Sequence, residues 1–166
     1  MGRHTSRKRL MLRSPSSNMP LRAGCLAVLL ATLASAASAA EQLVIIPFED
    51  AKFAPVSPTN PGGAQIAVLR GDPATGPSDM LMKTPRSEGQ LHFHTSDYRL
   101  TVISGVMKHW TPQSGRESAT SLGPGSYWFQ PGGQGHADDC LSDQCLMFIS
   151  WAGPKDTKPW TPAVPK

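Results

Sequence analysis

From Glu41 onward the chain is built of short segments in which apolar and polar residues alternate or apolar residues run together. No window shows the apolar spacing of an amphipathic helix, and turn-forming proline and glycine residues separate most of the segments. Many short strands in one domain predict an all-β sandwich or barrel. The expected strands are residues 42–46, 64–70, 79–83, 90–95, 98–103, 106–110, 126–130 and 145–151.

The first 40 residues have a different pattern. Six basic residues and no acidic residue come first, followed by the apolar run "AGCLAVLLATLA" and the small residues "SAASAA". This order predicts a secretory signal peptide over residues 1–40, cleaved after Ala39 or Ala40. A retained membrane anchor is the alternative, but the apolar run is shorter than the roughly 20 residues that span a bilayer. We therefore expect a periplasmic or secreted protein, without a membrane segment after cleavage.

Export changes the charge of the working protein. The full chain has 16 basic and 12 acidic residues, and six of the basic ones lie in the signal peptide. The mature chain, residues 41–166, keeps ten basic residues against twelve acidic ones, which gives a net charge of −2. No basic stripe remains, so the sequence does not predict nucleic-acid binding. We expect one domain with its core at about residues 42–152 and a proline-rich tail, residues 153–166, on the surface.

Two cysteines remain after cleavage, Cys140 and Cys145 in "CLSDQC". An even pair in an exported chain predicts a disulfide across a short turn. Free thiols, or a Cys140 thiolate bound to a metal, are the alternatives.

Chemistry first enters with His92 and His94 in "LHFH". Residues two apart on a strand point to the same face, so both imidazoles can approach one ion. Further along, the turn "PGGQGH" can deliver His136 to the same place, because its glycines adopt backbone conformations closed to other residues. The three histidines together predict a metal site.

The two histidine segments resemble the two motifs of the cupin superfamily. The second motif runs from Gly125 through Pro131 and Gly133 to His136, and the first contains the His-x-His pair and ends at Gly105. The resemblance implies a single cupin domain, a double-stranded β-helix or jelly-roll barrel of antiparallel strands. It points to small exported bacterial cupins without an assigned reaction, and to the zinc-holding cupin domain of an anti-sigma factor.

The chain departs from this pattern at three positions. Gly89 lies three residues before His92 where the family has its glycine six before, and Cys140 replaces an asparagine. Tyr98 stands where the family carries a glutamate ligand. A neutral phenol is a poor ligand because its ordinary pKa is about 10. On a regular strand Tyr98 shares the face of His94, so we expect either a general acid or a packed aromatic ring.

The resemblance implies a divalent metal held by His92, His94 and His136. Imidazole ligands suit Fe or Zn first, with Mn, Ni or Cu as further candidates. His109 in "VMKHW" is a candidate fourth ligand, although an isolated histidine near a strand end is more often part of the packing or the surface.

Two functions compete. A three-histidine site without the glutamate leaves coordination positions open, as in cupin oxygenases, which favours an oxygenase-type enzyme acting on a small organic molecule with Tyr98 as its catalytic residue. The alternative is a non-catalytic module that binds or senses zinc or a small ligand. The resemblance also implies a homodimer.

Overall fold

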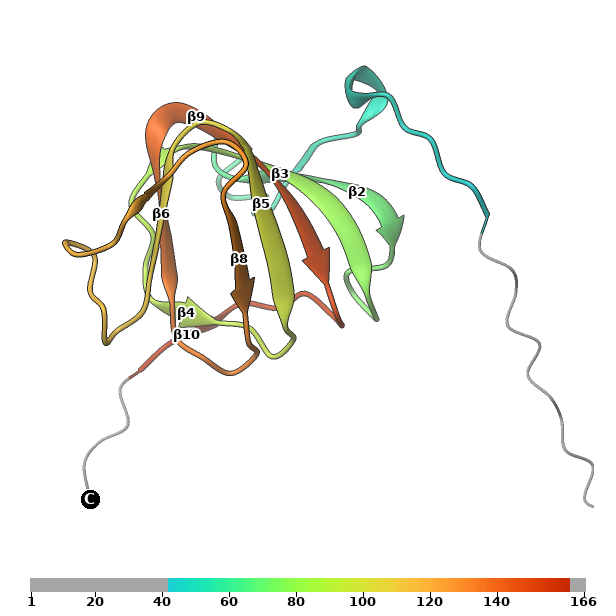
Figure 1. Ribbon diagram of the computed structural model, residues 1–166. Coiled ribbons are helices and arrows are strands. Elements are labelled where there is room, and N and C mark those ends of the chain that lie inside the picture. Colours follow the sequence, from blue (N-terminus) through green and yellow to red (C-terminus); the bar gives the residue numbers. More distant parts are fainter. Residues whose placement is uncertain (1–41, 162–166) are drawn as a thin grey trace, which may run out of the picture. The chain divides into compact units, whose positions relative to one another are not determined.

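The computed structural model describes residues 42–161 of the chain (Figure 1). The chain divides into two units, residues 1–41 and residues 42–166, and all described residues belong to the second. The predicted signal peptide, residues 1–40, lies outside the described residues, as do residues 162–166 of the tail.

The described residues form an all-β domain, which confirms the predicted fold class. One 3-10 turn, η1, precedes the strands. The elements are η1 Phe48–Asp50, β1 Ala54–Pro55, β2 Gln65–Gly71, β3 Ser78–Ser87, β4 His92–Phe93, β5 Tyr98–Ser104, β6 Met107–Trp110, β7 Ser121–Leu122, β8 Tyr127–Gln130, β9 Ala137–Trp151 and β10 Lys158–Pro159. Among residues 42–161 no helix is long and apolar enough to cross a membrane.

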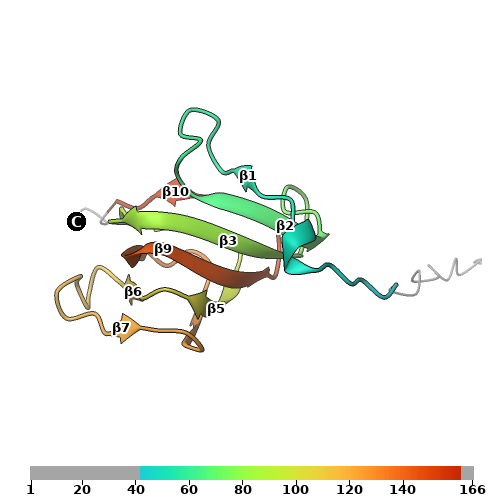
Figure 2. The same cartoon turned by 90° about the horizontal axis from the view of Figure 1, so that it is seen from above.

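Antiparallel pairing joins eight strands into one sheet in the order β1-β2-β3-β9-β5-β8, with β6 bonded to β9 and β7 bonded to β6. Seen from above, β2 and β3 lie on one side of β9, and β5, β6 and β7 lie on the other (Figure 2). A separate two-stranded sheet pairs β4 with β10. A bridge between His92 and His136 brings β4 next to the start of β9.

Strand β9 holds the sheet together because it has partners along most of its 15 residues. Its first residues, from Ala137 to Cys140, pair with β6, and its last six lie between β3 and β5. A disulfide joins Cys140 to Cys145 across the segment between these two halves. Beside it, Gly105 has a φ of 83°, and a Cβ there would lie 2.9 Å from the Cys145 sulfur. Glycine is therefore required at this crossing.

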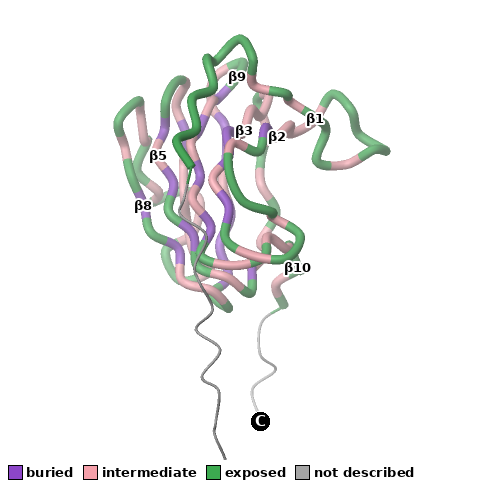
Figure 3. The backbone as a smooth tube through the Cα atoms, turned by 90° about the vertical axis from the view of Figure 1, so that its right-hand side faces the viewer, coloured by how far each residue is buried: buried purple, intermediate pink, exposed green. Residues whose placement is uncertain are grey.

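The interior is lined by every second residue of the longer strands, as the tube coloured by burial shows (Figure 3). On β8 the alternation is complete, since Trp128 and Gln130 are buried while Tyr127 and Phe129 face outward. Such alternation is expected of strands that cover a core on one face only.

Most expected strands are present, and the differences are local. Residues 42–46 were expected to be a strand, but they form none, and Leu43 and Ile45 are 86% and 78% exposed. The expected strand 90–95 is reduced to His92–Phe93. The expected strand 79–83 is longer in the structure, because β3 continues to Ser87 beside β9.

Candidate metal centre

Three histidines meet at one end of the barrel interior. His92 comes from β4, His94 follows directly after it, and His136 precedes β9. One ligand nitrogen from each lies within 4.8 Å of the other two. An ion that binds each nitrogen at about 2.0–2.1 Å would need only small ring movements to join them. The cluster could therefore hold a metal ion.

Backbone carbonyls fix the orientation of all three rings. Nδ1 of His92 is 2.8 Å from the Gln90 carbonyl oxygen, and Nδ1 of His136 is 3.1 Å from that of Gln134. Nδ1 of His94 contacts the carbonyl oxygen of Asp156. A carbonyl can only accept a hydrogen bond, so each Nδ1 carries the proton. In the neutral rings Nε2 is therefore the unprotonated nitrogen, with a lone pair free for a metal.

Burial keeps two of these rings neutral. His94 is 7% exposed and His136 is fully buried. Desolvation, together with the neighbouring imidazoles of His92 and His136, lowers the pKa of His94 to about 4, against the opposing effect of the hydrogen bond to Asp156. Desolvation also lowers the pKa of His136, against the opposing effect of the Asp138 carboxylate. Since protons and metals compete for the same lone pairs, neutral imidazoles at pH 7 are prepared to bind a metal.

Tyr98 faces the cluster from the start of β5. Its hydroxyl is 3.2 Å from Nε2 of His136, and Nε1 of Trp128 donates to the hydroxyl oxygen over 3.3 Å. Because Nε2 of His136 carries no proton, the hydroxyl donates to it; a bound ion would take this lone pair and leave the hydroxyl to donate to another acceptor. Burial raises the pKa of Tyr98 well above 10, and the nearby Asp138 carboxylate raises it further.

Tyr98 faces the histidines as expected, but it does not lie on the same strand as His92. The strand that was to carry His92, His94 and Tyr98 ends at Phe93, and β5 begins only at Tyr98. The intervening turn returns the chain so that the ring still points inward. Asp97 points away, as expected, and its carboxylate accepts a hydrogen bond from the backbone N–H of Gly132.

His109 is occupied by other partners. Its Nδ1 is 2.6 Å from a carboxylate oxygen of Asp138, and its Nε2 is 3.1 Å from the side-chain oxygen of Gln130. The ring also stacks on Trp128. With both nitrogens bonded, His109 supports the site instead of joining the ligand set. Cys140 is likewise not available as a thiolate, since it is bonded to Cys145.

Asp138 is a site residue that the sequence reasoning missed. One of its oxygens binds His109, and the other is 4.0 Å from Nε2 of His136. The sequence could have indicated this role, because Asp138 lies two residues after His136 at the start of a strand. Gly89 packs against this point, and a Cβ there would lie 2.9 Å from the backbone nitrogen of Asp138. The glycine that departs from the cupin pattern thus allows close approach of the two segments.

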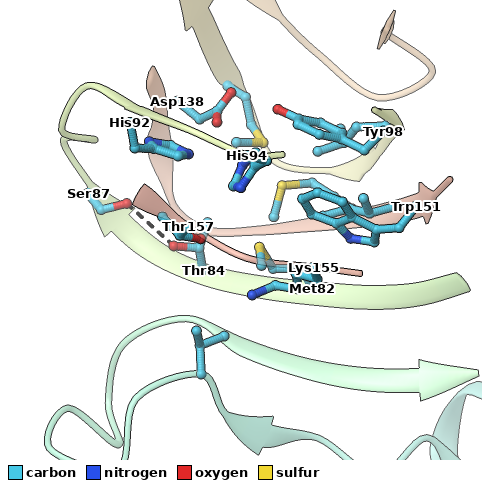
Figure 4. A pocket seen from close by; sticks show the side chains of 15 residues that line it. Met82, Thr84, Ser87, His92, His94, Tyr98, Asp138, Trp151, Lys155 and Thr157 are labelled. Atoms are coloured by element: carbon cyan, nitrogen blue, oxygen red, sulfur yellow. Dashed lines mark hydrogen bonds between the residues drawn. The ribbon is translucent and has the colours of Figure 1, made fainter. Parts of the chain in front are cut away.

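His92 and His94 line a cavity of about 220 Å³ (Figure 4). Its remaining walls are mostly apolar, with the indole of Trp151 and methionines from three different strands, and polar groups from Thr84, Ser87, Thr157 and Lys155. A small, mostly apolar cavity with few polar groups is typical of a binding site for a small organic molecule.

The described part of the C-terminal segment, residues 153–161, runs along the surface beside the site, and no residue in it is buried. Strand β10 pairs with β4, so that Pro159 lies opposite His92. The carboxylate of Asp156 accepts hydrogen bonds from the N–H and the hydroxyl of Thr95, over 2.8 and 2.9 Å. Sequence patterns gave no sign of this, because these contacts join segments about 60 residues apart.

Known structures with the same fold are cupins. The polyketide cyclase RemF from Streptomyces resistomycificus superposes with a TM-score of 0.58 at 20% identity, over 74% of this chain and 88% of that one. KdgF from Halomonas sp. superposes with a TM-score of 0.55 at 19% identity, over 70% of this chain and 96% of that one. A protein with a cupin-like fold from Ralstonia eutropha superposes with a TM-score of 0.55 at 23% identity, over 70% of this chain and 77% of that one.

None of the curated proteins matches the sequence. The structural likeness establishes the fold and confirms the resemblance to cupins, which rested on the glycine and histidine spacing. Residues 34–154 match a protein family described as "Domain of unknown function (DUF4437)". The chain therefore belongs to the DUF4437 family, and its domain is a cupin with a buried cluster of three histidines.

Proposed function

We propose that this protein is a metal-dependent cupin enzyme that acts on a small organic molecule. The observation that carries the proposal is the common orientation of His92, His94 and His136, whose Nδ1 atoms all contact backbone carbonyls while Tyr98 faces the same cluster. A bound divalent ion, Fe or Zn in the first place, would supply a Lewis acid with coordination positions open to a substrate.

Tyr98 provides the proton chemistry in this proposal. Its hydroxyl donates toward the cluster, and Trp128 donates to the same oxygen, which fixes the direction of the O–H bond. A substrate atom placed beside the histidines would receive this hydrogen bond and, in the transition state, the proton. Asp138 is the one carboxylate among the residues that line the cavity, and His109 holds it in place.

The proposed reaction is of the oxygenase type, because an ion held by three histidines would have coordination positions open to more than one small molecule. The apolar walls formed by Trp151 and the methionines support this chemistry, since they keep bulk water away from the reacting atoms. The polyketide cyclase RemF shares the fold, so the experiment must distinguish an oxygenase reaction from one that does not use oxygen.

The test uses the mature chain, residues 41–166, purified without oxygen and loaded with Fe(II) or Zn(II). Diketones, thiols and aromatic acids are screened for oxygen uptake and, separately, for substrate loss in the absence of oxygen. We expect metal-dependent turnover that disappears in the double variant H92A/H94A. Turnover without oxygen would show that the reaction is not an oxygenase reaction. The absence of metal-dependent turnover in both assays would contradict the proposal that the protein is an enzyme.

A non-catalytic zinc-binding module is the second candidate, and one distance favours it. The free carboxylate oxygen of Asp138 lies 4.0 Å from Nε2 of His136, so a modest movement would add a fourth ligand. A closed four-ligand sphere is characteristic of structural zinc. Zinc that resists dialysis in the wild type, becomes exchangeable in Asp138→Asn, and supports no turnover would establish this function instead.

Export and pairing are part of the proposal. The disulfide between Cys140 and Cys145 supports a periplasmic or secreted location, because such bonds persist in oxidising compartments. The outward-facing Ile103, Tyr127 and Phe129, which are 44%, 58% and 44% exposed, support a homodimer through the outer face of β5 and β8. Cell fractionation and sedimentation of the mature chain test these two points.

A further inference from the structure

A lysine lines the cavity together with the histidines, and it is the only lysine or arginine that does so in residues 42–161. Lys155 is half-buried, and burial lowers the pKa of its amine while the adjacent Asp156 opposes this effect. In Figure 4 Asp138 and Lys155 lie on opposite sides of His94. The cavity thus combines a carboxylate at one side with a cation at the other.

The amine of Lys155 is not neutralised by an acidic side chain. Among the described residues no carboxylate lies within 4.0 Å of it. Its neighbour Asp156 is engaged elsewhere, since that carboxylate accepts bonds from Thr95 and pairs with Lys158 over 3.1 Å. A cation that is partly removed from water and lacks a counter-ion is costly unless a ligand supplies the negative charge.

The backbone holds Lys155 firmly beside the cavity. Its own N–H donates to the Pro73 carbonyl over 2.8 Å, and the preceding carbonyl, of Pro154, accepts from the Ser96 hydroxyl over 2.8 Å. The carbonyl of Asp156 accepts from Nδ1 of His94. The same short segment therefore orients one histidine of the cluster and anchors the backbone of Lys155 beside the cavity before a ligand arrives.

From this arrangement we propose that the substrate is a small organic anion with an apolar body, and that Lys155 binds its carboxylate. The indole of Trp151 and the methionine side chains contact the body, and the opposite end of the molecule lies at the histidines. Lys155 is then the residue that selects acids over their uncharged analogues. The inference rests on the proposed function, because it names the substrate class of the same cavity.

The experiment compares benzoate with benzamide, which have similar shapes and differ in charge. Binding to the mature chain is followed by calorimetry for the wild type, for Lys155→Met and for Lys155→Arg. Lys52→Met is the control, because it removes one positive charge from an exposed position that does not line the cavity. We expect the wild type and Lys52→Met to prefer benzoate, Lys155→Met to bind it about tenfold more weakly, and Lys155→Arg to retain most of the preference.

Direct binding of benzoate to a metal is separated by repeating the titration with H92A/H94A. Retention of the preference for benzoate in this variant supports Lys155 as the anion site even if no enzyme activity is found. Loss of the preference there, equal benzoate binding by Lys155→Met and the wild type, or no benzoate binding by the wild type would each overturn the inference. We expect Lys155→Met to bind as much metal as the wild type. Benzoate binding therefore tests the anion site, and metal content tests the metal site independently.

Discussion

The hydroxyl of Tyr98 lies 3.2 Å from Nε2 of His136, the unprotonated nitrogen through which that ring would bind a metal. The residue that replaces the glutamate ligand of other cupins therefore stays beside the ligand set but contributes a proton donor instead of a negative charge. An ion held by His92, His94 and His136 would keep its full positive charge, and Tyr98 would face whatever binds next to it.

Replacing Tyr98 with phenylalanine separates these roles. Tyr98→Phe should bind metal with the wild-type stoichiometry, because the three histidines keep their carbonyl partners. Turnover should fall by about 10²–10⁴-fold, the usual contribution of a positioned general acid. Metal analysis together with kcat for any substrate found in the screen checks both statements. If kcat is unchanged, Tyr98 only fills space.

Acid should destabilise the metal-free protein. Burial lowers the pKa of His94 to about 4, below the ordinary value near 6.5, and it lowers the pKa of His136 as well. Between about pH 6.5 and pH 4 the unfolded chain therefore binds more protons than the folded one. The contribution of these neutral histidines to the free energy of unfolding is fully present above about pH 6.5 and is lost as the pH falls toward 4.

Thermal unfolding of the metal-free chain from pH 8 to pH 4 measures this effect. The melting temperature should decline below about pH 6.5, and the decline should be smaller in His94→Gln, which has no imidazole to protonate. Equal pH profiles for the two proteins would show that His94 does not contribute.

The disulfide should stabilise the barrel without affecting the metal. Cys140 and Cys145 are 1% and 0% exposed and join the two halves of β9. The double variant C140A/C145A closes no loop in the unfolded chain, and the loss for such a short loop is about 2 kcal/mol. Denaturant unfolding measures the change, and metal content is the control. A loss of metal in this variant would show that the cysteines support the histidine cluster.

The segment around Asp156 should control metal affinity from outside the ligand set. Asp156→Ala removes the bonds from the side chain to Thr95 and Lys158, which hold in place the backbone carbonyl that orients His94. Loss of such an indirect support typically weakens metal binding by about 10–100-fold. Competition with a chelator measures the affinity.

Asp143→Ala is the matched control for this experiment. Its carboxylate is fully exposed and pairs with Arg86 over 3.2 Å, and neither residue lines the cavity. Exposed pairs contribute little, so this variant should bind metal like the wild type. If Asp156→Ala and Asp143→Ala have the same affinity, the C-terminal segment does not position His94.

The sequence was sufficient to predict the parts of this site that depend on local spacing. His92, His94 and His136 could be found because histidine and glycine positions repeat a known pattern, and Gly105, Gly125 and Gly133 all have the positive φ that this pattern requires. The β-strands could be predicted from their alternation, as on β8.

Contacts between distant segments could not be predicted in the same way. Lys155 and Asp156 lie in a proline-rich stretch without alternation, and contacts with distant segments bring them to the cavity, among them the pairing of β10 with β4 and the bonds to Pro73 and Thr95. Residues 42–46 were predicted to form a strand from their apolar pattern, and this prediction was wrong. A strand needs a pairing partner, and this segment has none among residues 42–161. A local pattern therefore indicates what a segment can form, whereas the tertiary structure decides what it contacts.

The most direct test of the account is the metal content of the purified mature chain, measured by elemental analysis for three proteins. We predict about one divalent ion per chain in the wild type and in His109→Gln, whose ring is held by Asp138 and Gln130, and loss of the ion in H92A/H94A. Equal metal content in H92A/H94A and the wild type, or a wild type that takes up no metal when loaded, would contradict it.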